Sequence, residues 1–231
     1  MVWIQIKKYR YLMMMGLLLI VVGGLWSWLT HSHHFPIRHI KVEATYQKVT
    51  QQELTQAITP YLQKSFFGLP VNALKQRILQ IAWIDDVMVQ RIWPDTVHIR
   101  FTEQVAVVRW GHQALFNPQG ELFFPASDTF PQDLPILSGP AGMERQIFRT
   151  YREMDQILTV VDLRIAQVKV SHRYAWTVRL NNGSELILGK EKPIRRLKRF
   201  IAVHDQLFAD HARVAESIDL RYPDGLAVRW Q

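Results

Sequence analysis

The hydrophobic and polar positions divide the chain into an uncharged N-terminal run and a longer part with short alternating segments. The run Tyr11–Leu29 has 19 residues without a charge. A helix rises about 1.5 Å per residue, so about 20 apolar residues cross the hydrocarbon core of a bilayer. Lys7, Lys8 and Arg10 precede the run. The positive-inside bias therefore predicts a single transmembrane helix at residues 11–29 and a cytoplasmic tail at residues 1–10.

A cleaved signal peptide is the alternative for this run. Its apolar region would usually be about 7–15 residues long and would end at a small-x-small cleavage site. Trp26, Trp28 and Leu29 occupy that neighbourhood instead. The sequence therefore favours an uncleaved anchor, followed by a linker at residues 30–35 and about 200 residues outside the cytoplasm.

Residues 36–103 contain the order strand, helix, helix, strand, strand. Apolar residues alternate with polar ones from Ile40 to Ala44, and a capping box at Thr50 and Glu53 opens the first helix. A second helix follows Pro70, and two alternating runs flank the turn Trp93-Pro94-Asp95. This order predicts two helices packed on a small sheet, which is the arrangement of a POTRA module.

Residues 104–231 predict a second, mixed α/β domain. Strand-like runs occur at residues 105–110, 115–124, 176–180 and 185–188, and helical spacing occurs from about residue 143 and over 193–208. Asn182-Gly183 marks a tight hairpin. The chain ends in a second hairpin, Ser217–Trp230, with its turn at Pro223-Asp224-Gly225.

The terminal hairpin has two interpretations. A last strand often lies at the edge of a sheet, where its unpaired N–H and C=O groups need protection from aggregation. The same groups offer pairing to a strand of another protein, with alternate side chains giving specificity. Tyr222 and Trp230 would be aromatic anchors, and Arg221 and Arg229 would select an acidic partner. The sequence leaves both interpretations open.

The amino-acid composition excludes several classes of function. The chain has no cysteine, which excludes disulfides, cysteine-ligated zinc and thiol catalysis. A net charge of +8 suits nucleic acid or an anionic membrane as a partner. The basic run Lys190–Arg199 is best explained as a helix whose solvated face carries Arg195, Arg196 and Arg199. Outside the cytoplasmic membrane no chromosomal DNA is met, so no nucleic-acid binding is expected.

Motifs for catalysis are not found. The sequence lacks G-x-S-x-G, a P-loop, H-E-x-x-H and G-x-G-x-x-G. The histidines of residues 31–34 are too closely spaced for a tetrahedral metal site. Asp85 and Asp86 are adjacent in a strand and should point to opposite faces. We expect no catalytic residues, cofactor, metal or small-molecule substrate.

Nearly the whole chain resembles the FtsQ/DivIB family of bacterial cell-division proteins. The similarity begins with IDDVMVQRIWPDTVHIRFTE in the POTRA-like part. It continues with FNPQGELF, LPILSG, TYREMDQIL, WTVRLNNG, LGKEKPIRRLKRF and DLRYPDGLAVRW in the family's order. The resemblance implies an α+β protein with one transmembrane helix, a POTRA domain and a second periplasmic domain. One departure is the end at Gln231, without the polar tail that some members carry.

The resemblance also implies partners and sites. In FtsQ the C-terminal edge docks the periplasmic segments of FtsB and, with it, FtsL. The matching positions here are Arg173, Arg221, Tyr222, Asp224, Gly225 and Trp230, although Asp224 replaces a small hydroxyl residue. In relatives the POTRA module is linked to earlier recruits to the septum, including FtsK, and FtsW and FtsI are further expected partners. Val71, expected in the loop before the second helix, and Val89 fall near positions implicated there, although their periodicity is that of core residues.

We therefore expect a non-enzymatic, single-pass scaffold of the divisome, in the inner membrane at the division septum. The alternative is a POTRA chaperone for polypeptides in secretion or outer-membrane assembly, which should carry repeated POTRA units or a barrel. A membrane-tethered enzyme is a third class and would need convergent polar residues in a pocket.

Overall fold

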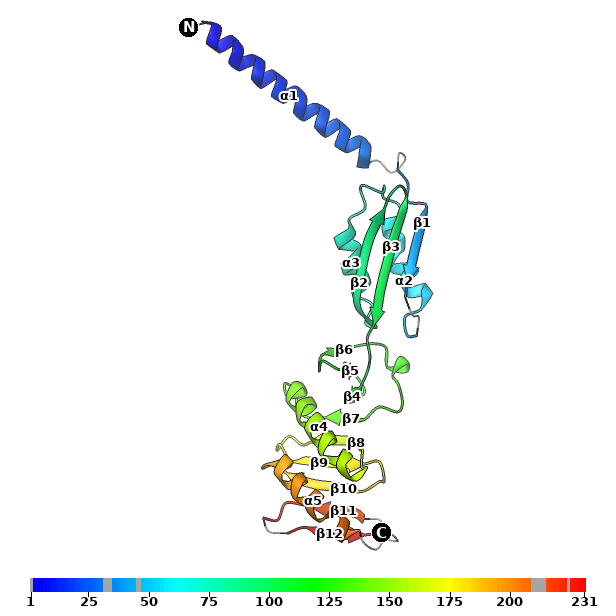
Figure 1. Cartoon of the computed structure of the whole chain (residues 1–231), viewed down its shortest axis with the longest axis vertical. Helices are drawn as coiled ribbons and strands as arrows, with labels where there is room; N and C mark the ends of the chain where they lie inside the picture. The colour runs from blue at the N-terminus through cyan, green and yellow to red at the C-terminus, as the bar shows by residue number, and fades with distance from the viewer. Residues whose placement is uncertain (1, 31–34, 45–46, 209–214, 224) are drawn as a thin grey trace. The chain divides into compact units, whose positions relative to one another are not determined.

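The computed structural model describes residues 2–30, 35–44, 47–208, 215–223 and 225–231, without the side chains of residues 2–12, 29 and 30. The chain divides into two compact units, Met1–Gln104 and Val105–Gln231. Each unit has its own buried apolar residues, and together they give an α+β fold (Figure 1).

The first helix, α1, covers Val2–Thr30. The described side chains of this helix are mostly exposed, and they include Met13, Leu17 and Ile20. Among the residues that the structure describes, no helix reaches the length and hydropathy of a membrane span.

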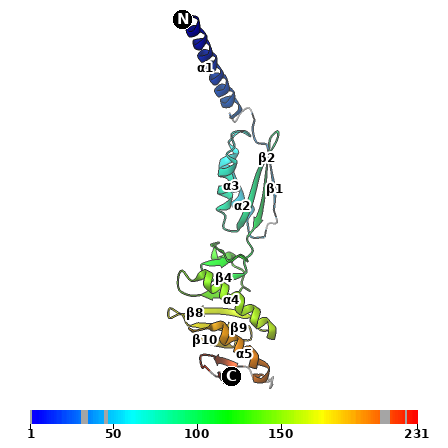
Figure 2. The same cartoon turned by 60° about the vertical axis from the view of Figure 1, so that its left-hand side comes forward.

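The rest of the first unit is a three-stranded sheet covered by two helices on one face (Figure 2). Its elements are β1 (His39–Glu43), α2 (Gln51–Leu62), α3 (Val71–Leu79), β2 (Ile84–Ile92) and β3 (Thr96–Glu103). The strand order is β1-β3-β2, with β1 parallel and β2 antiparallel to β3. Leu54, Leu74 and Ile99 are among the residues that fill the core between the layers.

Local hydrogen bonds explain where these elements begin and end. The capping box at α2 is formed, since the Thr50 hydroxyl accepts the Glu53 N–H and the Glu53 carboxylate accepts the Thr50 N–H. At the end of β3, the Glu103 carboxylate accepts the N–H groups of Gln47, Lys48 and Val49 at 2.9–3.2 Å. A charged acceptor for three backbone donors fixes the segment before α2 against the last strand.

The second unit is built on a nine-stranded sheet with the order β12-β11-β10-β9-β8-β7-β4-β5-β6. The strands are β4 (Val108–Trp110), β5 (Ala114–Phe116), β6 (Leu122–Phe123), β7 (Ile136–Ser138), β8 (Ile165–Val170), β9 (Trp176–Leu180), β10 (Glu185–Gly189), β11 (Ala215–Asp219) and β12 (Ala227–Trp230). The helices are α4 (Glu144–Leu158) and α5 (Pro193–Leu207), with short 3₁₀ turns at Ser127–Thr129 and Thr159–Val161. Both helices lie on the same face of the sheet, and Ile147, Met154, Leu197 and Phe200 are fully buried there (Figures 1 and 2).

The pattern of alternation predicted most of these elements, with some differences. The strand expected at residues 105–110 is only Val108–Trp110. The strand β8 was not anticipated, although it lies in the middle of the sheet next to β9. In α5 the residues expected to face inward from their spacing were Ile194, Leu197, Ile201 and Phe208, and this set did not include Phe200, which is completely buried.

Candidate functional site

The terminal hairpin of β11 and β12 forms one edge of the nine-stranded sheet. β11 pairs in parallel with β10, and β12 pairs antiparallel with β11 through Asp219↔Ala227 and three further registered pairs. β12 stands last in the strand order, so its far side meets no other strand among the described residues. The edge expected from the sequence is therefore present in the fold.

The register shows which backbone groups of β12 face outward. The Leu220 N–H donates to the Ile187 C=O at 2.9 Å, across the β10–β11 boundary. Since backbone groups alternate sides along a strand, Asp219 turns its own N–H and C=O toward β12, where its partner is Ala227. The next residue, Val228, then directs its N–H and C=O to the free side of β12.

Trp230 lies two residues after Val228 in the same strand, so its backbone N–H and C=O also face outward. Its side chain, however, turns to the helical side of the sheet. The indole is half-buried and meets the Phe208 ring edge-on at a centroid distance of 5.8 Å. Tyr222, in contrast, is 55% exposed. Trp230 is thus partly a core residue, and Tyr222 is the accessible aromatic residue of the hairpin.

Arg199 of α5 holds the turn between β11 and β12. Its guanidinium donates to the carbonyl oxygens of Leu220 at 2.9 Å, Tyr222 at 2.7 Å and Pro223. Its neighbour Arg196 donates to the Leu188 carbonyl at the end of β10. The assignment of both arginines to a solvated helix face was therefore wrong, because both side chains reach across the edge of α5 to sheet carbonyls. Arg195 is exposed, as expected.

A hollow of about 380 Å³ separates the last turns of α5 from the hairpin. It is lined by Arg199, Val203, Gln206, Leu207, Gly225 and Leu226. Most of this lining is apolar, and the hollow opens beside the residues that lead into β12. It could receive one apolar side chain from a segment lying along the edge.

Arg221 is paired within the hairpin rather than free. Its guanidinium contacts Asp219 at 2.6 Å (Nη2 to Oδ2) and 2.9 Å (Nε to Oδ1), and these hydrogen bonds hold the pKa of Asp219 below its usual range. The aliphatic part of Arg221 packs near Gly189, whose φ is +71°, and a Cβ on Gly189 would lie 2.8 Å from Arg196 Nη1 and 3.0 Å from Arg221 Cγ. The pair remains mostly exposed on the Arg221 side, so the guanidinium still presents charge to solvent.

Arg173 lies in the turn between β8 and β9, at the same end of the sheet. The Ser171 hydroxyl accepts the N–H of Arg173 and that of Ala175, which shapes this turn. The next residue, Tyr174, lies under the ammonium of Lys190, 6.0 Å from its ring centroid, and Lys190 follows Gly189. The fold thus brings Arg173 and Arg221 to one end of the sheet.

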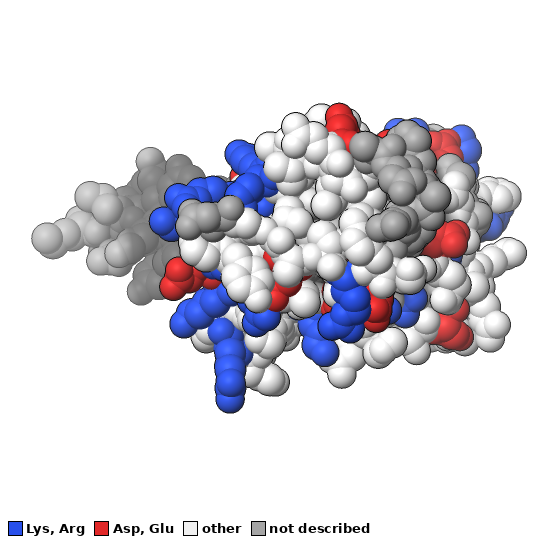
Figure 3. All heavy atoms as spheres, turned by 90° about the horizontal axis from the view of Figure 1, so that it is seen from below, with Lys and Arg blue, Asp and Glu red and all other residues white. Residues whose placement is uncertain are grey.

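The remaining expected residues of this edge are Asp224 and Gly225. Asp224 lies outside the described residues, and Gly225 lines the hollow. Figure 3 views the chain from the end where β12 lies, and it shows Lys and Arg side chains around an uncharged central area, with Asp and Glu between them. The surface seen from this end is therefore uncharged in its middle, with charged side chains of both signs around it.

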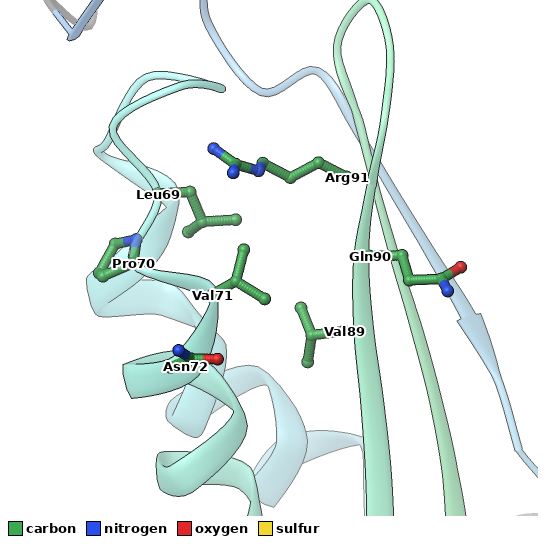
Figure 4. Close-up of a pocket in the computed structure, with 7 residues that line it drawn as sticks. All are labelled: Leu69, Pro70, Val71, Asn72, Val89, Gln90 and Arg91. Atoms are coloured by element: carbon green, nitrogen blue, oxygen red, sulfur yellow. The ribbon is translucent and has the colours of Figure 1, made fainter.

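Val71 and Val89 meet in a second hollow, in the first unit. It measures about 770 Å³ and lies between the start of α3 and β2, where Leu69 and Arg91 also line it. Figure 4 shows the side chains of Val71 and Val89 facing each other, with Gln90 turned away. Val71 is the first residue of α3 rather than a loop residue, and it is half-buried, while Val89 is 8% exposed.

No described group offers an evident catalytic centre. A third hollow, of about 580 Å³, is lined by Asp133, Tyr151, Asp155 and Arg164, among others. Burial, reinforced by Asp155, raises the pKa of Tyr151 to about 12, so this phenol is protonated at neutral pH and does not serve as a base. No three His, Asp or Glu among the described residues are grouped to hold a metal ion, and His31–His34 lie outside them.

Sequence reasoning did not anticipate the clamp made by Arg199 or the hollow beside α5. A signal for the clamp was present. Arg196, Arg199 and Val203 follow one another at spacings of three and four residues, directly beside the buried stripe of α5. Positions flanking a buried stripe reach neighbouring backbone more readily than positions opposite to it.

Comparisons with known proteins agree with this architecture. The family model "Cell division protein FtsQ/DivIB, C-terminal" matches residues 106–221, and "POTRA domain, FtsQ-type" matches residues 35–104. Among curated relatives, "Cell division protein FtsQ" of Methylomonas methanica is 34% identical over 218 residues, covering 93% of this chain and 88% of the relative. The proteins of the same name from Coxiella burnetii and Neisseria meningitidis are 30% and 29% identical, over 85% and 96% of this chain and 81% and 93% of their own lengths. The chain belongs to the FtsQ/DivIB family of cell-division proteins.

Proposed function

We propose that this cell-division protein is a non-enzymatic scaffold that captures a segment of a partner protein on the outer side of β12. The observation that carries the proposal is the position of β12 at the end of the sheet, with the backbone groups of Val228 and Trp230 directed outward. An added strand would form main-chain hydrogen bonds with these groups. This mode of binding is β-augmentation.

The side chains around the edge suit a partner segment that carries both apolar and acidic residues. Tyr222 is accessible, the hollow beside α5 accepts an apolar side chain, and Arg173 and Arg221 supply positive charge at one end. A segment that alternates apolar and polar residues, with acidic residues near the Arg173 end, would complement all three features. By family resemblance, the partner segments are the periplasmic parts of FtsB and FtsL.

The hollow at Val71 and Val89 is the proposed second contact surface. It is open, it is lined by Leu69 and Pro70 besides the two valines, and the edge strand β2 forms one of its walls. The family resemblance links FtsK to the POTRA part, and FtsW and FtsI are further proposed partners. Docking there would leave the β12 edge available for the other partner.

An anchor in the inner membrane completes the proposal. The uncharged run Tyr11–Leu29 extends beyond the described side chains of α1 at both ends, and Lys7, Lys8 and Arg10 precede it. We assign residues 1–10 to the cytoplasm, 11–29 to the membrane and 30–35 to a linker. The POTRA domain (36–103) and the second domain (104–231) would lie in the periplasm at the septum.

The decisive experiment replaces Val228 with proline in a protein of residues 36–231. Because the Val228 N–H faces outward, this change removes a donor from the free side and leaves the β11–β12 hydrogen bonds in place. Capture of an FtsB-like periplasmic segment should weaken at least about tenfold, which is about 1.4 kcal/mol. Tyr222→Ala should weaken capture as well, with little effect on the thermal unfolding temperature.

The matched control is Met88→Ala, which removes an apolar side chain that is 46% exposed on the other unit. Trp230→Ala is a poorer test, since losing its contact with Phe208 should also destabilise the domain by about 1–2 kcal/mol. If Val228→Pro folds and captures the segment as well as the wild type does, docking at this edge is excluded.

A further inference from the structure

One end of the first unit exposes three large apolar side chains. Phe67 is 38% exposed, Ile92 46% and Trp93 73%. Phe67 belongs to the loop between α2 and α3, and the other two lie where β2 turns into β3. Large apolar side chains exposed together on a folded domain usually mark a contact surface.

Side-chain contacts bring the loop of Phe67 to the same end as Ile92 and Trp93. Arg91 donates from Nη1 to the carbonyl oxygens of Phe66, at 3.2 Å, and Phe67, at 3.0 Å, which ties the loop to the end of β2. The Phe67 ring also meets the Phe35 ring edge-on at 5.1 Å. We call the surface formed by Phe67, Ile92 and Trp93 the aromatic end.

Cationic side chains surround the aromatic end. Arg38, Lys64 and Arg91 are exposed there. Arg38 is placed by its N–H, which donates to the Asp95 carbonyl in the β2–β3 turn at 3.0 Å. Asp95 is the acidic residue of this turn, and its carboxylate accepts the Thr96 hydroxyl at 3.1 Å. Three cations against one carboxylate favour an anionic surface as the partner.

The chain length restricts where this end can lie. Phe35, whose carbonyl accepts the Phe66 N–H at 2.7 Å, follows the end of α1 at Thr30 by five residues. Five extended residues reach about 17 Å at most. Phe35, whose ring meets the Phe67 ring, therefore lies within that distance of the end of α1, which keeps the aromatic end near α1.

We propose that the aromatic end rests in the interfacial layer of the lipid bilayer, with Trp93 and Phe67 among the headgroups and Arg38, Lys64 and Arg91 against lipid phosphates. This inference rests on the proposed membrane anchor. Tryptophan and phenylalanine partition well into the interface, and nearby cations add attraction to anionic lipid. The contact gives the POTRA domain a second attachment to the membrane and fixes which of its faces points away from it.

The test uses the full chain in lipid nanodiscs. The chain has no cysteine, so one introduced cysteine carries a nitroxide label at a unique position. Ile92→Cys places the label at the aromatic end, and Met88→Cys is the matched control, since both side chains are 46% exposed on the same face of β2. The two positions lie about 13 Å apart along the strand. Accessibility of each label to oxygen, which concentrates in lipid, and to a water-soluble nickel chelate reports its environment.

We expect the label at residue 92 to be at least threefold more accessible to oxygen, relative to the nickel chelate, than the label at residue 88. Adding Phe67→Ser and Trp93→Ser to Ile92→Cys should abolish that difference. Replacing anionic with zwitterionic lipid should reduce it, which would identify the contribution of the cations. If the ratio of oxygen accessibility to nickel-chelate accessibility is the same at residues 92 and 88 in anionic discs, the proposal is overturned. Failure of the chain to remain with the discs would instead contradict the anchor.

Discussion

At the scale of single residues, Glu43 is the point where three side chains of the first unit meet. Its carboxylate lies 2.9 Å from Lys41 Nζ, 2.6 Å from Arg100 Nη2 and 3.2 Å from His98 Nε2. Hydrogen bonds from Lys41 and Arg100 lower the pKa of Glu43 from its ordinary value of 4.5 to about 2. The contacts with His98 and Arg100 join β1 to β3, the parallel pair of the small sheet.

The sign of this shift predicts an acid-dependent weakening of β1. A carboxyl group whose folded pKa is lowered stabilises the fold fully above about pH 4.5, and this contribution is lost as the pH falls toward 2. Hydrogen-exchange protection of the β1 amides should therefore fall more steeply between pH 4.5 and 2 in the wild type than in Glu43→Gln. Parallel pH profiles for the two proteins would contradict this assignment.

At the scale of elements, α5 and the terminal hairpin behave as one assembly because Arg199 joins them. Arg199→Leu removes donors to three carbonyl oxygens and should cost the hairpin about 1–3 kcal/mol of local stability. The amides of Ala227 and Arg229, which pair with β11, should then exchange about 10- to 100-fold faster.

The matched control for that substitution is Arg195→Leu, which removes an exposed arginine from the same helix. It should leave the exchange of the β12 amides unchanged. Arg199→Lys should restore part of the protection, since an ammonium group keeps the charge but not the planar fork that spans several carbonyls. Equal exchange in the Arg195 and Arg199 variants would show that the clamp is dispensable.

The spacing of apolar and polar residues was sufficient to predict most of the elements. It gave α2 and α3 of the first unit, α4 with the buried residues Ile147, Tyr151, Met154 and Leu158, and the terminal hairpin. It missed β8, which lies between two other strands and is framed by no turn as plain as Asn182-Gly183. The order of the strands in the sheet could not be predicted either, because local periodicity contains no information on which distant segments pair.

The candidate site shows the same division. Tyr222 is exposed and β12 lies at the edge, as expected. Arg221 and Trp230 were expected to be available to a partner, but both already make contacts within the domain. Arg221 is engaged by Asp219 and Trp230 by Phe208. Such contacts join residues whose proximity is set only by tertiary packing, so no spacing in the sequence identifies them.

At the scale of the whole molecule, the net charge of +8 should accelerate association with an acidic segment. Arg173→Glu and Arg145→Glu both lower the net charge to +6, since each replaces +1 by −1. Arg173 stands at the proposed edge and Arg145 is exposed on α4. At low salt, Arg173→Glu should slow association with the acidic segment about tenfold more than Arg145→Glu does.

Ionic strength provides the check on this charge effect. With a screening length of about 10 Å at 0.1 M salt and about 3 Å at 1 M, the difference between the two variants should largely disappear at high salt. Stopped-flow association rates at two salt concentrations measure this directly. Identical rates for the two variants at low salt would mean that overall charge, not its position, controls the encounter.

The hollow between α5 and the hairpin makes the edge sensitive to small molecules that never touch its backbone. Val203 and Leu226 form opposite walls of this hollow, and the guanidinium of Arg199 is part of its lining. A compact apolar compound wedged there would press Arg199 away from the carbonyl oxygens of Leu220 and Tyr222. The hairpin would loosen, and the compound would also fill the space that an apolar side chain of the partner segment would occupy, so binding at the proposed edge would be inhibited from the side of the helix.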